Sequence, residues 1–557
     1  VFAFASGVLS SPHEWYALVM AALWQMDQAL HGLADSEIKM QRRQFNQQLQ
    51  RSAIALALTP WLQVVAAPTE TTRTWRHNPF VLGVASGRPR ADSVVLWTRV
   101  LLGEEDRLAG TDALRVSVEV FADVTLKRRV YKTDVATDAT RAHSVHVHVQ
   151  RLQPSTDYWY RFSQGDATST VGHTRTAPAL SADVQTLRIA LASCQHYEQG
   201  QYIAHEEIAK QQLDFVLFMG DYIYESSNPQ YAIRKHNGEE PKTLQQYRER
   251  YEQYKRDPML QAAHAAHPWV LMWDDHEVVN DYANDQDRQH TDPKQVLLRR
   301  AAAYQAYFEH QPVLLGPDAN NPANMRLYDQ LSWGKLADVW TLDCRQYRSA
   351  QACRDPVRGG GRMVVQCDEL ADPTRSMLGA EQERWFTEGL SQSKRQWKLV
   401  AQATQISSTS VPTPVGRSYW NDAWDGYPEA RKRLLQAVVD AKQNNVVTLG
   451  GDVHCNVAAN LRLDPNNPQS PIVASEFVTT SITSRGLGDK PAAVIRESNA
   501  DLLHYRSDER GYSLITVTPK EVRCDFRTTK FPAGSEAGLK TQASYVVKNG
   551  KAGPQLM

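Results

Sequence analysis

Five short and almost uninterrupted apolar runs constrain the fold of this chain more than any other feature of its sequence. The runs are residues 187–194, 215–221, 269–276, 398–404 and 446–454. A strand that is apolar along its whole length is buried on both faces, as in a sheet that lies between two other layers. Amphipathic helical patterns, clearest at residues 243–267 and 428–443, separate the runs. The alternation predicts a layered α/β fold, and strand patterns at residues 476–483, 512–518 and 522–528 indicate a second sheet.

The region before these runs has a different periodicity. Polar and apolar side chains alternate in short segments at residues 93–97, 114–120, 143–149 and 157–162. A period of two is typical of strands with one buried face. The pattern Leu152-x-Pro-x-Thr-x-Tyr158 resembles the tyrosine corner of fibronectin-type sandwiches. We therefore predict a small β-sandwich here, followed by a linker at residues 176–181.

Length and charge limit the number of domains and the class of partner. A chain of 557 residues favours two domains, one of them large. Lys plus Arg equals Asp plus Glu, both 62, so no overall positive field attracts nucleic acid, and no specific nucleic-acid partner is inferred. No apolar run is long enough to predict a transmembrane segment.

The segment around Met40 has the layout of an export signal. Its elements, in order, are the pair Arg42-Arg43, an uncharged stretch at residues 52–65 and the small residues of Val65-Ala-Ala67. The pair resembles the twin-arginine signal, although Gln41 stands where that signal usually has Ser. We therefore predict that residues 40–67 are a signal peptide read by the twin-arginine (Tat) export machinery, and that the protein is periplasmic or secreted.

Residues 1–39 form an unassigned leader without a recognisable motif. Our hypothesis is that translation starts at Met40 and that these residues lie upstream of the true start. The alternative is a long, unusual leader. Further along the chain, Cys353 and Cys367 flank a glycine-rich loop, where a disulfide would form in an oxidising compartment. Two unpaired thiols are an equal alternative at the level of the sequence.

Four of the apolar runs end in residue types that bind metals. The endings are Ala192-Ser-Cys194, Gly220-Asp-Tyr-Ile-Tyr-Glu225, Trp273-Asp-Asp-His-Glu277 and Gly450-Gly-Asp-Val-His454. A turn after a buried strand would explain any one of them. Together they would bring a thiol, a phenol, imidazoles and carboxylates into one crevice, because the carboxyl ends of neighbouring strands lie side by side. So many carboxylates repel one another unless cations lie between them, and the pattern therefore predicts a metal centre.

Eight segments along the chain resemble the signature segments of one family. They are Asn78-Pro-Phe-x-x-Gly-Val-Ala-Ser-Gly87, Ser193-Cys-Gln195, residues 220–225, residues 273–277, Asp343-x-Arg-x-Tyr-Arg348, Trp424-Asp-Gly-Tyr427, Gly451-Asp-Val-His454 and Glu476-Phe-x-Thr-Thr-Ser481. The family is that of the PhoD-like alkaline phosphatases, which are calcineurin-like metallophosphoesterases related in their metal site to purple acid phosphatases. The resemblance implies a four-layer αββα metallophosphoesterase sandwich at residues 182–557, preceded by a small fibronectin-like β-sandwich at residues 76–177.

The resemblance also implies the metals. It implies that iron(III) is held by four residues, which are Cys194, Asp221, Tyr224 and His454. Asp221 would bridge to calcium, of which one or two ions are expected. Asp275 and Asp452 stand where the wider superfamily has Asn and His, and carboxylates in place of nitrogen and amide ligands favour a hard ion such as calcium over zinc. A phenol is deprotonated at neutral pH by a strong Lewis acid, so Tyr224 favours a trivalent partner.

The expected chemistry is attack of metal-activated water on phosphorus, with Asp221 and Asp275 holding the ions. His276 would donate a hydrogen bond to a non-bridging or leaving-group oxygen. The alternative for His276 is helix capping or packing. Most of the superfamily has Asp-x-His where this chain has Cys194-x-His196, and His196 is therefore predicted only as a neighbour of the metals.

Three further residues are candidates for substrate contacts. Arg345 and Arg348 would hold phosphate through bidentate hydrogen bonds, and their alternative is pairing with nearby carboxylates. Asp425 would reach the calcium, or else it is a turn residue before glycine. Glu225 and Glu277 are expected to orient the metal ligands from behind.

The predicted activity is hydrolysis of small phosphate mono- and diesters, with an alkaline optimum because calcium acidifies water less than zinc does. The export signal leaves phospholipid or teichoic-acid diesters of the envelope as alternative substrates, for a phospholipase D-like phosphodiesterase. An alternative from another class is a secreted binding protein without catalysis, in which the metals are structural.

Overall fold

The computed structural model describes residues 73–557, except residues 104–105, 107–112, 535 and 537. The predicted leader at residues 1–39 and the predicted signal peptide at residues 40–67 lie outside the described residues. None of the described helices combines the length and the apolar character that crossing a membrane requires.

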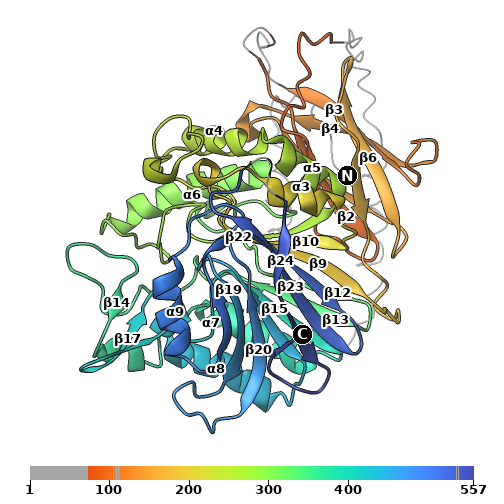
Figure 1. The fold of residues 1–557 in the computed structure, drawn as a ribbon. Helices are drawn as coiled ribbons and strands as arrows, with labels where there is room; N and C mark the ends of the chain where they lie inside the picture. The colour runs from red at the N-terminus through yellow and green to blue at the C-terminus, as the bar shows by residue number, and fades with distance from the viewer. Residues whose placement is uncertain (1–72, 104–105, 107–112, 535, 537) are drawn as a thin grey trace, which may run out of the picture. The chain divides into compact units, whose positions relative to one another are not determined.

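In the described part of the chain, the larger of two stacked sheets has ten strands (Figure 1). In spatial order they are β25 (Gln555–Leu556), β24 (Lys540–Lys548), β23 (Glu521–Lys530), β22 (Glu509–Val517), β9 (Leu187–Ala192), β10 (Phe215–Met219), β11 (Pro268–Met272), β1 (Val84–Gly87), β2 (Ser93–Arg99) and β5 (Ser144–Gln150). The central strands β9, β10 and β11 run parallel to one another, so their carboxyl ends lie at the same edge.

Alternate residues of these central strands face two different cores. In β10, Phe215, Leu217 and Met219 pack in the core between the two sheets. Val216 and Phe218 pack in a second core against helices. Because both faces are covered, all five side chains are buried. This double burial explains why the sequence shows a continuous apolar run instead of an alternating one.

The second sheet has seven strands in the described residues. In spatial order they are β12 (Asp329–Trp333), β13 (Ala337–Leu342), β15 (Trp397–Gln402), β18 (Val446–Gly450), β20 (Ile472–Val478), β19 (Asn456–Arg462) and β21 (Leu502–Arg506). Strands β13, β15, β18 and β20 are parallel to their neighbours in this series. The inner faces of the two sheets share one apolar core, to which β9, β10, β15 and β18 all contribute.

Helices cover the outer face of each sheet (Figure 1). The ten-stranded sheet is covered by α3 (Ile203–Lys210), α4 (Leu244–Lys255), α5 (Pro258–Ala266) and α6 (Pro293–His310). The seven-stranded sheet is covered by α7 (Gly379–Gln392) and α8 (Pro428–Asp440), and α9 (Asp489–Glu497) packs beside β21. The order helix, sheet, sheet, helix confirms the predicted four-layer αββα fold.

A smaller sheet lies in the amino-terminal region. It contains β4 (Arg129–Thr137), β3 (Leu114–Phe121), β6 (Asp157–Gln164), β7 (Ala167–Thr168) and β8 (Gly172–Arg175). The tyrosine corner is present, because the backbone N–H of Gln153 donates a hydrogen bond to the hydroxyl oxygen of Tyr158 at 2.9 Å. The sheet packs through one apolar core on β1, β2 and β5, which completes a sandwich.

The sequence pattern suggests a separate sandwich. In the structure, however, the sandwich shares a sheet with the region that follows it. One of its two layers is the end of the ten-stranded sheet, since β1 pairs in parallel with β11. Consequently all seven residues of β2 are buried. The indole N–H of Trp97 in β2 donates to the carbonyl oxygen of Glu309 in α6 at 3.0 Å, and the ammonium of Lys255 in α4 lies 4.2 Å from the ring centre.

The excursion between β13 and α7 is closed by a disulfide between Cys353 and Cys367. The other described cysteines, Cys194, Cys344, Cys455 and Cys524, are free and buried. Beyond the disulfide, β14 (Met363–Val364), β17 (Gly416–Trp420) and β16 (Val411–Thr413) form a small three-stranded sheet.

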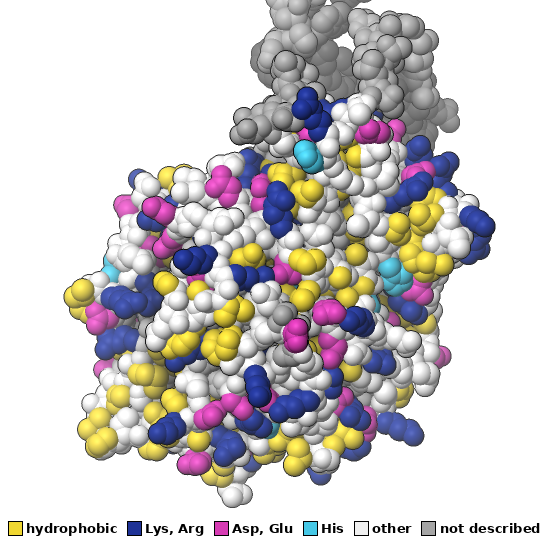
Figure 2. All heavy atoms as spheres, turned by 45° about the horizontal axis from the view of Figure 1, so that its top comes forward, with side chains coloured by type: hydrophobic (Ala, Val, Ile, Leu, Met, Phe, Trp, Pro, Cys, Tyr) yellow, Lys and Arg dark blue, Asp and Glu magenta, His cyan; other side chains and the backbone are white. Residues whose placement is uncertain are grey.

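Charged side chains of both signs are interspersed over the face in Figure 2, with hydrophobic side chains scattered among them. This distribution agrees with the equal numbers of acidic and basic residues in the sequence.

The shared sheet predicts that both regions unfold together. Trp97→Ala removes a fully buried indole that joins β2 to α4 and α6, and it should cost about 3–5 kcal/mol of stability. Because the sheet is continuous, calorimetry should show one transition at a lower temperature. Val130→Ala, at an exposed position of β4, is the control and should leave the transition in place. Two separate transitions, of which Trp97→Ala moves only one, would contradict the prediction.

Candidate metal centre

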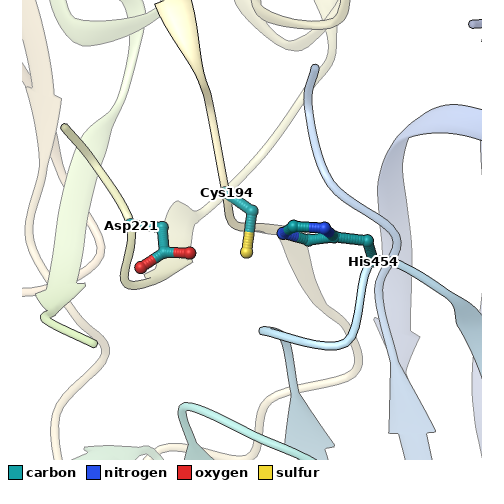
Figure 3. Close-up of side chains that lie close together, drawn as sticks. All are labelled: Cys194, Asp221 and His454. Carbon is teal, nitrogen blue, oxygen red and sulfur yellow. The ribbon is translucent and has the colours of Figure 1, made fainter. Parts of the chain in front are cut away.

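Side chains from separate strand ends meet at one point. Cys194 follows β9, Asp221 follows β10 and His454 follows β18. A sulfur, a carboxylate oxygen and a ring nitrogen from these three residues all lie within 4.8 Å of one another. Figure 3 shows the three side chains pointing toward one another from three different segments. The structure thus brings together residues that the sequence predicted to converge.

A second group shares Asp221 with the first. Ligand atoms of Asp221, Asp275 and His276 also lie within 4.8 Å of one another. Oδ2 of Asp275 accepts a hydrogen bond from the backbone N–H of Asp281 at 2.7 Å. Oδ1 is buried and has no hydrogen-bond partner among the described residues. A buried carboxylate oxygen without a donor is unfavourable, and a bound cation would satisfy it, so the residues here fit a metal ion.

The backbone at these positions adopts an uncommon conformation. The φ angles are 58° at Cys194, 58° at Asp221, 63° at Asp452 and 53° at His454, all in the left-handed region. Such residues cost about 1–3 kcal/mol each and persist where the surrounding structure holds them. Between β10 and Asp221, Gly220 has a φ of 103°, and a Cβ there would lie 2.4 Å from the backbone nitrogen of Asp274. Glycine at 220 therefore allows the loops after β10 and β11 to touch.

The carboxylate of Glu277 fastens the same two loops together. It accepts backbone N–H groups of Asp221 at 3.0 Å, Tyr222 at 2.6 Å and Asp274 at 2.8 Å. The loop after β9 joins them, since the N–H of Cys194 donates to the carbonyl oxygen of Gly220 at 3.0 Å. Glu277 thus positions Asp221 through the backbone.

The thiol and the phenol next to Asp221 do not ionise readily by themselves. Burial raises the pKa of Cys194 well above its usual value, and the carboxylate of Asp221 raises it further. The same two causes raise the pKa of Tyr224. The hydroxyl of Tyr224 donates to Oδ2 of Asp221 at 2.8 Å and lies 3.2 Å from Nε2 of His454. A cation among these atoms would supply the positive charge that a thiolate and a phenolate need.

His454 is arranged to present a neutral ring. Burial lowers its pKa to about 3. Its Nδ1 lies 2.6 Å from the carbonyl oxygen of Arg485, so Nδ1 carries the proton and donates it there. Nε2 is then left with a lone pair that faces Tyr224, as a metal-binding imidazole requires.

Two acidic residues near the centre were not singled out from the sequence. Asp281 and Asp422 form a third group with Asp275, again with carboxylate oxygens within 4.8 Å. Burial, together with repulsion from Asp422 and Asp275, raises the pKa of Asp281 to about 6. Asp281 follows the Trp273–Glu277 segment by four residues, and Asp422 precedes the Trp424 segment by two, so the motifs marked the right loops but the wrong positions.

In the structure, Arg345 and Arg348 pair with carboxylates, which is the alternative to their predicted phosphate contacts. Both side chains are buried. The guanidinium of Arg345 donates to both carboxylate oxygens of Asp274 and to Asp422, the latter at 2.8 Å. Arg348 donates to Asp422 at 2.6 Å. Although burial opposes ionisation, the two arginines hold the pKa of Asp422 well below its usual range. They neutralise carboxylates inside the protein.

Asp425, predicted to reach the calcium, has other partners in the structure. Its Oδ2 accepts the backbone N–H of Thr409 at 2.8 Å, and its Oδ1 accepts Arg431 at 3.0 Å. Asp425 thus holds the loop after β15 against the start of α8. Asp452 is closer to the centre, where its Oδ2 accepts the hydroxyl of Thr404 at 2.7 Å, and burial raises its pKa to about 6.

His276 is held by an acidic partner. Its Nδ1 lies 2.6 Å from Oε2 of Glu225, and its ring centre lies 4.0 Å from that of Tyr224. Burial opposes protonation, but the carboxylates of Glu225, Asp221 and Asp275 raise the pKa of His276 well above its usual value. The ring centre of His196 lies 4.4 Å from that of Tyr224, with the rings tilted by 37°, and so His196 lies beside the centre.

Family models, a curated protein and a solved structure all point to the same family. Residues 189–526 match the family described as PhoD-like phosphatase, and residues 65–178 match the N-terminal domain of PhoD-like phosphatases. Alkaline phosphatase D of Bacillus subtilis (strain 168) is 41% identical over 526 residues, which cover 92% of this chain and 88% of that protein. A solved structure of PhoD is 40% identical, has a TM-score of 0.82 and covers 87% of this chain and 93% of its own.

Glu277→Gln tests how the loops are held. Oε2 of Glu277 accepts two backbone N–H groups and Oε1 accepts one, so an amide NH2 would oppose two donors in one orientation and one donor in the other. We expect affinity for metal to fall about 10- to 100-fold, measured as metal per chain during dialysis against graded chelator. Glu388→Gln, at an exposed position of α7, should retain wild-type metal content. Equal metal content in both variants would show that Glu277 does not position the ligands.

Proposed function

We propose that this chain, which belongs to the PhoD-like phosphatase family, hydrolyses both mono- and diesters of phosphate with water activated by iron(III) and calcium ions. Phosphatase activity itself follows from membership of the family and from the similarity to alkaline phosphatase D. The observation that carries the proposal is the convergence of Cys194, Asp221 and His454 beside the unpaired carboxylate oxygen of Asp275.

The donor types indicate two kinds of ion. We assign iron(III) to Cys194, Asp221, Tyr224 and His454, because a thiolate and a phenolate beside a carboxylate match a trivalent charge. One or two calcium ions would lie among the carboxylates of Asp221, Asp275, Asp452 and Asp281. Oxygen donors without sulfur favour a hard cation. When bound, the ions would acidify water and polarise the phosphoryl oxygens.

The protein's own contribution centres on His276. Glu225 holds the ring through Nδ1, so Nε2–H is the group left to donate to a phosphate oxygen. The carboxylate of Glu225 raises the pKa of His276 and so favours the protonated ring. His276 would thereby stabilise charge on a non-bridging oxygen or give its proton to the departing alkoxide. Arg345 and Asp274 form a buried ion pair, which neutralises both charges and keeps the base of the site rigid.

Export to the periplasm or the exterior is part of the proposal. A disulfide between Cys353 and Cys367 supports it, because disulfides persist in oxidising compartments. We retain the signal peptide at residues 40–67 and the Tat machinery as its reader. Residues 76–177 and 182–557 are proposed as the amino-terminal and catalytic domains, and the two family matches support this division.

Substitution of His276 tests its role in proton donation. His276→Ala should lower kcat by about 10²- to 10⁴-fold for an alkyl phosphate, whose leaving group needs a proton. The loss should be much smaller for p-nitrophenyl phosphate, whose leaving group is stable as an anion. Metal content should stay unchanged, as a check on folding. Equal losses for both esters would assign His276 a structural role, and no loss would show that His276 takes no part in catalysis.

Removal of metal tests the identity of the ions. Protein purified from its export route should contain iron and calcium but no zinc, measured by elemental analysis. A calcium-selective chelator should abolish phosphate release, and calcium should restore it where zinc does not. Stoichiometric zinc, or full activity after removal of calcium, is incompatible with this assignment.

A further inference from the structure

An apolar pocket opens directly beside the metal centre. Its volume is about 590 Å³, within the range of pockets that bind small organic molecules. Asp452 and His454 belong to both the pocket and the centre. A phosphate held at the centre would therefore have its ester group next to this space.

The walls of the pocket come from three separate segments. The small sheet supplies Met363, Val411 and Trp420, the segment leading into α9 supplies Leu487, and α9 supplies Val494. Four of these side chains are substantially exposed: Met363 at 44%, Trp420 at 37%, Leu487 at 49% and Val494 at 54%. Large apolar side chains that gather at the mouth of a cleft usually mark a place of contact with a ligand or partner.

Several polar groups of the pocket already have hydrogen-bond partners within the protein. Asp425 is bonded to Thr409 and paired with Arg431. The amide of Gln405 donates to the carbonyl and hydroxyl oxygens of Ser407 at 3.1 and 2.8 Å. Its Oε1 is buried without a partner among the described residues, and it offers one acceptor for a hydroxyl group. The guanidinium of Arg485, which also lines the pocket, lies 4.2 Å from the ring centre of Tyr231. The pocket thus offers much apolar surface, with one cationic side chain in its wall.

We infer that this pocket binds the alkyl group of alkyl phosphate esters, so that the enzyme prefers amphiphilic esters over small polar ones. The inference rests on the proposed hydrolysis at the metal centre and adds a substrate class to it. An alkyl group is the expected occupant because the pocket is continuous with the metal centre: His454 and Asp452 line both the apolar walls and the position of the phosphate. Burial of each methylene should increase kcat/KM about three- to fourfold until the pocket is full.

A series of methyl, butyl, hexyl and octyl phosphate tests the inference with the metal-loaded full chain. Leaving-group pKa changes little beyond the shortest alkyl groups, so a rise of kcat/KM with chain length reports binding of the alkyl group. Val494→Asp places a charge in the wall at an exposed helix position. It should abolish the rise while leaving methyl phosphate hydrolysis unchanged. Leu487→Ser is a second, milder variant in the same wall and should reduce the rise.

Val130→Asp, at a 51% exposed position of β4, is the matched control and should retain the wild-type rise with chain length. A flat series in the wild type would overturn the inference, as would a rise that survives both wall substitutions. Binding to phosphatidylcholine vesicles that Val494→Asp abolishes, together with a flat series, would also overturn it and make the patch a membrane contact. Absence of activity on every ester, methyl phosphate included, would instead refute the proposed function.

Discussion

Repulsion among buried carboxylates is the constraint around which this structure is arranged. Asp221, Asp274, Asp275, Asp422 and Asp452 all lie near one point at the carboxyl ends of the strands. Arg345 and Arg348 neutralise Asp274 and Asp422 from inside the protein. Asp221 and Asp275 remain without a cationic side chain that satisfies them fully, since Oδ1 of Asp275 has no partner among the described residues. Internal arginines thus neutralise two of these five carboxylates, and bound metal ions would stabilise the other three.

Assembly of the centre requires strained backbone conformations in addition to the repulsion between carboxylates. Left-handed residues follow β9, β10 and β18, and each turns its side chain away from its strand toward the common point. The bonds of Glu277 to three backbone N–H groups, and the close contact at Gly220, hold these turns in place. A site held in this way is largely formed before metal binds, which favours affinity because little has to be ordered on binding.

The sequence predicted the layers and the convergence of ligands because both depend on simple patterns. A run such as β10 is apolar throughout only when both of its faces are covered, and Cys194, Asp221 and His454 converge because parallel strands end at one edge. Pairing between distant residues has no such pattern. The contacts of Arg345 with Asp274 and Asp422 span 71 and 77 residues, so motif spacing could not distinguish a phosphate contact from an internal ion pair. Asp281 and Asp422 were missed because they lie four residues after one motif and two residues before another.

The parallel pairing of β1 with β11 has a consequence for how the chain can be divided. A protein cut at the linker would leave the backbone groups of β11 that now bond to β1 without partners, beside the apolar surfaces of Trp269 and Leu271. An open strand edge of this kind recruits other chains and promotes aggregation. The amino-terminal strands therefore act as a built-in edge cover, and the catalytic region is not expected to remain soluble as a truncated fragment.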